Sequence, residues 1–291
     1  MSEFIAEPLD LSRILKPTLV AVDFDAIKAE RLAQLKARFV ESGLDWDVGK
    51  LEANPGVILQ REDAYRQTLD LQSINDMALA RTFGFARGAD LDWLAATFYA
   101  DVPGISRLAG ELDDRYERRI AAAGEALSGA ITEGGIVYHA LTFDRRIVDA
   151  VAYRVRPGVV ACVILLEADA PADAIRTGLA ARLRSPKLRG TEEVSVQVAF
   201  PVETAIRVRL RHGPGPDPAL LNAASFAALT AVKTRVEAKI GAALTTDEII
   251  AAARVGNVTK LVLESPMADV IPGRNGVLKI GAIEVTTELV R

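Results

Sequence analysis

The chain has 291 residues, half of them hydrophobic, so it can bury a substantial core as one large domain or two to three small ones. Its formal net charge of −4 gives no general attraction to phosphate backbones, which disfavours nucleic acid as the main partner. The lone cysteine, Cys162, excludes an intramolecular disulfide, and the sequence contains neither a secretory signal pattern nor an apolar run of membrane-spanning length. These features predict a protein that stays in a reducing cytosol unless it leaves as part of a particle.

The first part of the chain is predicted to be helical. An arm over residues 1–22 is too apolar for a solvated tail and is expected to lie on another surface. Asp23 is a good N-cap for a helix to about Ser42. A longer helix is predicted from Pro55 to Arg81, with apolar side chains on several faces, as is typical of a helix surrounded by its own domain or by partner chains. The candidate interface residues on these two helices are Phe24, Ile27, Leu35, Phe39, Tyr65, Leu69, Ile74 and Met77.

The stretch from Leu112 to Val155 changes from helical to strand periodicity. Asp113 and Asp114 are predicted to cap a helix whose apolar side chains form one face as far as Leu127. The Gly134–Gly135 pair is predicted to be a flexible entry into a second helix. A strand follows, and the side chains expected to share one of its faces are Ile147, Asp149, Val151, Tyr153 and Val155.

The remaining chain alternates strands and helices, so the sequence predicts an α+β fold with mainly antiparallel sheets. Helix, strand, strand, helix, strand form a first unit, with a hairpin turn at Pro157–Gly158. Pro201 is predicted to mark the crossing into a second unit of strand, helix, helix, strand, strand. Asp217 is a predicted N-cap there, and Thr245 begins a capping box. The predicted division is an arm over residues 1–22, a helical domain over 23–130, and two α+β units over 131–200 and 201–291.

No group of residues specifies a chemistry, so the sequence predicts no catalytic, cofactor-binding or metal-binding site. His139 and His212 have no cysteine or second histidine at ligand spacing, and core or loop roles explain them better. The pairs Asp45–Asp47 and Asp90–Asp92 lack the further oxygens of a calcium loop and are interpreted as caps and turns. Asp114 and Arg118 are interpreted as an ion pair one helical turn apart.

Arg207, Arg209 and Arg211 share one face of a predicted strand and form the main basic row of the sequence. Solvated residues of an edge strand are the simpler explanation. An acidic protein partner is the sharper alternative, and nucleic acid is a distant third.

Several motifs together resemble the baseplate J-like family, the wedge proteins of contractile phage tails and related particles. Residues 86–95 resemble its A-x-G-x-x-L-D-x-L-A signature, and residues 113–120 its D-x-x-Y-x-x-R-I segment. An early DF…AER helix, a glycine-then-aromatic helix and a late P-x-x-D turn agree in the same order. The matching motif residues are Gly88, Leu91, Asp92, Leu94, Asp113, Tyr116, Arg119, Ile120, Tyr138, Pro266 and Asp269.

The resemblance implies a structural role without a cofactor. Such proteins lie in the wedge as two copies joined to one smaller tail-protein-I-like subunit, and six wedges close around a hub. The implied partners are a second copy of this chain, that small subunit, neighbouring wedges, and sheath or hub proteins. A divergent enzyme and a soluble module that binds an acidic partner remain the alternatives.

Overall fold

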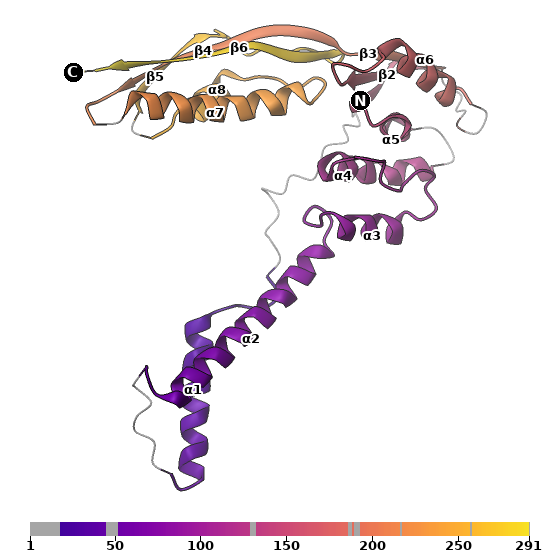
Figure 1. Ribbon diagram of the computed structural model, residues 1–291. Coiled ribbons are helices and arrows are strands. Elements are labelled where there is room, and N and C mark those ends of the chain that lie inside the picture. Colours follow the sequence, from indigo (N-terminus) through magenta and orange to yellow (C-terminus); the bar gives the residue numbers. More distant parts are fainter. Residues whose placement is uncertain are drawn as a thin grey trace. The chain divides into compact units, whose positions relative to one another are not determined.

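The computed structural model describes residues 18–44, 52–128, 132–185, 188, 193–215, 217–256 and 258–290 (Figure 1). The chain divides into two compact units, and the division falls between Phe98 and Tyr99. We call the described residues up to Phe98 the helical unit and those from Tyr99 onward the mixed unit. Within the described residues, no helix combines the length and the apolar character that a membrane span requires.

The helical unit contains α1 (Phe24–Glu41), α2 (Pro55–Ala80) and α3 (Ala89–Phe98). The Asp23 side chain accepts a hydrogen bond from the backbone N–H of Ala26, which confirms the predicted N-cap. Asn54 caps α2 in the same way, with Pro55 in the first turn. Asp90 lies inside the first turn of α3, so the prediction that it caps this helix is wrong.

The helices α1 and α2 pack together with little complete burial. No residue of α1 is fully buried, and Val57 and Ala64 are the buried residues of α2. Polar contacts tie the pair together, including a 2.9 Å hydrogen bond from Arg31 Nε to Gln67 Oε1. The Asn75 side chain also binds the backbone of residues 19–20, the described end of the predicted arm.

The mixed unit begins with α4 (Asp113–Ala121), the 3-10 helix η3 (Ala123–Leu127) and α5 (Glu133–Phe143). The prediction of one continuous helix through Leu127 is wrong, because the α-helix ends at Ala121 and tightens into η3, where Gly124 lowers helix propensity. The two glycines of the predicted flexible entry are also buried inside α5. A Cβ atom on Gly135 would lie 3.3 Å from the Glu125 carbonyl oxygen, so glycine here permits close packing of η3 on α5.

The first sheet contains β1 (Ile147–Arg156), β2 (Val159–Leu166) and β3 (Glu193–Val198), in the order β1-β2-β3. The β1–β2 hairpin is antiparallel, whereas β2 and β3 are parallel. Helices α5 and α6 (Ala172–Leu183) contribute to the core of this sheet. The α+β class is confirmed, but the sheets are mixed rather than mainly antiparallel.

A register shift between Ile147 and Asp149 divides the predicted face of β1. Ile147 packs in the helix-covered core of the first sheet, whereas Val151 and Tyr153 pack in a second cluster with Ile240 and Val277. The prediction that Ile147 shares a face with Val151 is therefore wrong, because the irregularity inverts the alternation that the sequence pattern assumes.

The second sheet contains β4 (Phe200–His212), β5 (Val258–Ser265) and β6 (Gly276–Leu289), in the order β5-β4-β6. Strand β4 is antiparallel to β5 and parallel to β6. Helices α7 (Pro218–Glu237) and α8 (Thr246–Ala253) lie on one face of this sheet (Figure 1). The predicted caps at Asp217 and Thr245 are confirmed by side-chain bonds to the first turns of α7 and α8.

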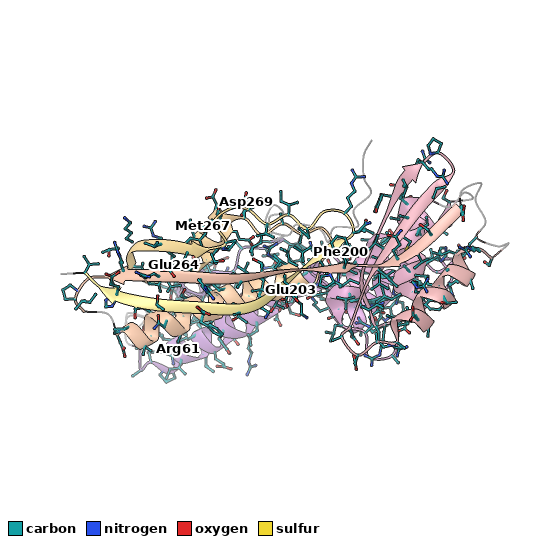
Figure 2. All side chains as sticks on the ribbon, turned by 90° about the horizontal axis from the view of Figure 1, so that it is seen from above. Arg61, Phe200, Glu203, Glu264, Met267 and Asp269 are labelled. Carbon is teal, nitrogen blue, oxygen red and sulfur yellow. The ribbon has the colours of Figure 1, made fainter. Side chains whose placement is uncertain are left out.

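The chain passes from one sheet to the other at a single residue, Ala199. Its N–H donates to the Ile164 carbonyl of the first sheet, while the N–H of Phe200 donates to the Asn275 carbonyl beside the second. Pro201 already lies within β4, so the crossing is two residues earlier than predicted (Figure 2 labels Phe200 and Glu203 at this end of β4). Burial raises the pKa of the Asp149 carboxyl near this junction, where Asp149 accepts a hydrogen bond from the N–H of Ile240.

Candidate functional site

The family-motif residue Arg119 organises a buried ionic cluster. Its side chain is fully buried and pairs with Glu111 through bonds of 3.1 Å from Nε and 2.7 Å from Nη2. Its guanidinium also donates to the carbonyls of Gly104 and Ser106. Burial alone raises the pKa of the Glu111 carboxyl, but hydrogen bonds from Arg119 and from the Leu108 N–H, with the nearby arginine charges, lower it below its usual value overall.

Arg115 connects this cluster to the first sheet. It pairs with Glu111 and donates to the carbonyls of Leu141, Asp144 and Ile147, which lie at the end of α5 and the start of β1. Arg118 pairs with Asp149 at 3.4 Å and donates to the Val148 carbonyl, where the sequence predicted a pair with Asp114. Three arginines of one short helix therefore hold the chain around it in place.

The other residues of the D-x-x-Y-x-x-R-I motif serve the same cluster. Asp113 does not cap α4, because its carboxylate pairs with Arg107 at 2.7 Å. The guanidinium carbons of Arg107 and Arg119 lie over the buried ring of Tyr116, at 4.6 Å and 4.9 Å from its centre. Ile120 is buried one turn further on. The motif thus encodes a structural core.

The remaining motif residues are also structural. Tyr138 donates to the Pro103 carbonyl from its buried position in α5. Gly88 precedes α3 at a φ of +56°, a conformation that favours glycine, and Leu91 is buried in α3, which also carries Asp92 and Leu94.

The late P-x-x-D turn, which follows Pro266, ties α8 to the loop between β5 and β6. Asp269 accepts hydrogen bonds from both the N–H and the hydroxyl of Thr246, the first residue of α8. Leu244 and Val270 exchange two backbone hydrogen bonds beside it. Figure 2 labels Met267 and Asp269 on this loop, and Met267 is exposed.

The described residues do not assemble acid-base or metal chemistry. They contain no group of three or more histidine, cysteine or acidic residues that could hold a metal ion. The His212 ring contacts the carbonyl of Gly213, and Cys162 lies in the first core, where burial raises the pKa of its thiol to about 12. The pair Asp45–Asp47 lies outside the described residues.

Burial at His139 predicts a pH dependence of stability. Desolvation, reinforced by the charge of Arg182, lowers the pKa of His139 to about 4 from 6.5. His139 binds its proton at a higher pH in the unfolded chain than in the folded chain. The stabilisation that neutral His139 gives the folded state is therefore complete above pH 6.5 and is lost as the pH falls towards 4. We expect the free energy of unfolding to fall by about 2 kcal/mol from pH 7 to pH 5. Urea titrations at both values test this.

His139→Phe is the matched variant, since it removes the titrating group and keeps an aromatic ring in the site. In this variant the loss between pH 7 and pH 5 should shrink to a few tenths of a kcal/mol. An unchanged pH dependence would assign the effect to other groups.

Helix α2 exposes several large apolar side chains. The predicted interface residues on α1, namely Phe24, Ile27, Leu35 and Phe39, are half-buried in the α1–α2 pair. Those on α2 are open to solvent, with 53% exposure at Tyr65, 47% at Leu69 and 54% at Met77. Ile58 lies on the same side of the helix as Tyr65 and Leu69, whereas Ile74 and Met77 are exposed on other sides. Exposed apolar side chains that run the length of a helix indicate an interaction site.

A groove at the α2–α3 turn adds two aromatic side chains that sequence analysis did not select. It encloses about 560 Å³ and is lined mainly by Arg81, Asp90, Trp93 and Phe98. Trp93 is 74% exposed and Phe98 is 69% exposed. Large exposed aromatic residues are common anchors of protein interfaces. The sequence shows the residue types of Trp93 and Phe98, but only the structure shows that they are exposed.

The predicted basic row is compensated within its own sheet. Arg207 pairs with Glu284 at 3.0 Å, Arg211 with Glu288 at 2.9 Å, and Arg209 with Glu264 at 2.5 Å. Strand β4 is central, so the explanation of this row as part of an edge strand is wrong. The row lies on a charged face of the sheet with glutamates on both neighbouring strands.

Comparison with known proteins agrees with these motifs. Residues 52–103 match the baseplate J-like N-terminal domain. Over 280 residues, the chain is 29% identical to baseplate protein J of Escherichia phage P2, covering 90% of this chain and 92% of that protein. Over most of its length, the chain is therefore similar to baseplate J-like proteins. The relative that it matches is a phage baseplate protein, and the matched domain is the N-terminal domain of baseplate J-like proteins.

Proposed function

We propose that this baseplate J-like chain is a wedge subunit. It joins wedge subunits into the ring around the hub and transmits the signal for sheath contraction. Two observations support this role: the similarity to baseplate J-like proteins, and an apolar surface that the described part of the chain does not cover. Its partners in this proposal are a second copy of the chain, a small tail-protein-I-like subunit, neighbouring wedges, and sheath or hub proteins.

The open apolar face of α2 carries the proposal. A pair of helices in which one member has no fully buried residue gains little stability from its own packing, and a neighbouring subunit can cover the remainder. Burying the exposed halves of Tyr65, Leu69 and Met77 is worth roughly 1 kcal/mol each. Several such contacts suit an interface of standard size, on the order of 1,000 Å² or more.

The division of the chain supports the signalling part of the proposal. The helical unit and the mixed unit meet along the chain at Phe98 and Tyr99. Separate compact units in one chain can move relative to one another unless a large apolar interface joins them. A baseplate subunit with two such units can take part in two arrangements of the plate.

Co-expression with a small tail-protein-I-like subunit tests the proposal. We expect a stable complex of two copies of this chain with one copy of the partner, measured by native mass spectrometry. The partner expressed with an unrelated helical protein is the control. A chain that stays monomeric and ignores the partner contradicts the wedge role.

No specific observation favours either alternative, a divergent enzyme or a module that binds an acidic partner. Neither His139 nor His212 lines the cavities at Trp93, at Arg115 and at Asp149, so none of these three cavities gathers a histidine with carboxylates. The arginine row already pairs with glutamates on its own sheet, which weakens its interpretation as a surface for an acidic partner.

A further inference from the structure

Strand β6 is a long edge strand of the second sheet. It runs for 14 residues and pairs with β4 on one side, and no other described strand pairs with it. An edge strand of this length presents a row of backbone N–H and carbonyl groups that another chain can use, and natural proteins usually block such edges. Whether the chain itself covers each half of this edge therefore indicates whether that half can bind another strand.

Helix α7 and the turn after it block the first half of the edge. Lys233 Nζ donates to the Ile280 carbonyl at 2.6 Å, and the Ile280 N–H donates to Glu237 Oε1 at 2.6 Å. The N–H of Gly241 donates to the Gly276 carbonyl at 2.9 Å. The outward backbone groups of Ile280 and the Gly276 carbonyl are therefore satisfied inside the chain.

The chirality of L-residues determines which backbone N–H and carbonyl groups in the second half of β6 point away from β4. In a strand of L-residues, side chains on one face accompany backbone groups that point to one edge. The core-facing residue Ile280 points its backbone groups outward, so the core-facing residues beyond the register shift at β6 do the same. These residues are Ile283, Val285, Thr287 and Leu289.

This second half is left open by the described part of the chain. No described residue bonds to the outward backbone groups of Ile283, Val285 or Thr287, and the side chains along it are exposed or half-buried. Phe226 is 49% exposed and lies on the face of α7 that also carries Lys233, two turns away along the helix. An added strand would thus find both backbone partners and an apolar contact.

The carboxylates beside this edge determine which side-chain charges an added strand can carry. Glu284 and Glu288 alternate with Thr286 on the face away from the core. Each pairs with an arginine of β4 through its Oε2 atom, and the two side chains remain about half exposed. A second copy paired antiparallel about Thr286 would place glutamate opposite glutamate, which is unfavourable. On its inner side, β6 already accepts a strand with arginine opposite both glutamates, with Arg207 paired to Glu284 and Arg211 to Glu288.

We propose that the outer edge of β6 from Ile283 to Leu289 is a docking site for an extended segment of another protein with basic side chains at alternate positions. The segment becomes a fourth strand, bound through the outward backbone groups and through the free lone pairs of Glu284 and Glu288. This surface is additional to the apolar face of α2, and its test does not need the proposed wedge partners.

A peptide with the sequence of residues 205–212, Ala-Ile-Arg-Val-Arg-Leu-Arg-His, is the probe, because its pattern already pairs with β6. Labelled at its amino end, it should bind the full chain saturably in fluorescence anisotropy. The control peptide Ala-Ile-Glu-Val-Glu-Leu-Glu-His should bind roughly 10-fold more weakly or worse. Methylation of alternate backbone nitrogens of the probe should abolish binding, because the added strand loses its donors.

Val285→Pro removes an outward N–H without removing a bond to β4, and Val285→Thr is the matched control that keeps this N–H. We expect the proline variant to lose peptide binding and the threonine variant to keep it, with circular dichroism spectra unchanged in both. Absence of saturable binding to the wild-type chain overturns the docking site. Equal binding of the two peptides overturns the charge selection. A wild-type dimer that Val285→Pro dissociates would assign the edge to a second copy and overturn the partner class.

Discussion

Replacing Arg119 with methionine should destabilise the chain by about 3–5 kcal/mol, because it leaves Glu111 buried without its bidentate partner. The carbonyls of Gly104 and Ser106 lose donors in the same step. Urea unfolding followed by circular dichroism measures the loss. The Glu111 pKa should also rise, because Arg119 is the main group that lowers it against the effect of burial.

Arg176→Met is the matched control, since Arg176 forms an exposed ion pair with Asp173 and should cost under about 0.5 kcal/mol. The double variant Glu111→Gln/Arg119→Met should recover part of the loss, because the buried carboxylate is then neutral. A cost for Arg119→Met below about 1 kcal/mol would show that the cluster does not hold this part of the fold. The double variant also keeps the test usable if the single variant fails to fold.

Replacing Leu69 with glutamate should prevent assembly with the wedge partner while leaving the chain folded. Leu69 is central to the open face of α2, and a carboxylate there would be buried unpaired at the interface. We expect the dissociation constant of the complex to rise about 100-fold or more, measured by native mass spectrometry and by titration. The free chain should change in stability by less than about 0.5 kcal/mol, because the side chain is already half exposed.

Ala37→Glu on the exposed side of α1 is the matched control, because it adds the same charge to a helix of the same unit. It should leave the complex intact. A Leu69→Glu chain that assembles as tightly as the wild type would remove the α2 face from the proposed interface. Loss of assembly in both variants would indicate a general effect of charge.

Short sequence patterns correctly predicted the helix ends and the hairpin turn that depend on residues close together in the chain. Asp23, Asp217 and Thr245 cap their helices as predicted, because an N-cap bond spans only two or three residues. The β1–β2 hairpin is likewise set by the turn at Pro157–Gly158. Such features follow from the sequence since the interacting groups are always close together.

Predictions failed where a distant group competed for the same atoms or the same space. Asp113 has the residue type of a cap, yet it is the first residue of α4 and its carboxylate pairs with Arg107 from the preceding loop. The glycines at 134–135 resemble a hinge, but the carbonyl of Glu125 approaches one of them. The register shift in β1 and the change of sheet at Ala199 depend on strand pairing, which a periodic pattern does not encode.

The sequence by itself determined the α+β class, most helices and strands, and the family motifs that point to a baseplate protein. These depend on periodicity, caps and fixed spacing, which are properties of short segments. The tertiary structure alone decided that the motif residue Arg119 pairs with Glu111 in a buried cluster, that the basic row is paired with glutamates, and which backbone edge stays open. Each of these depends on which residues far apart in the chain become neighbours when the core forms.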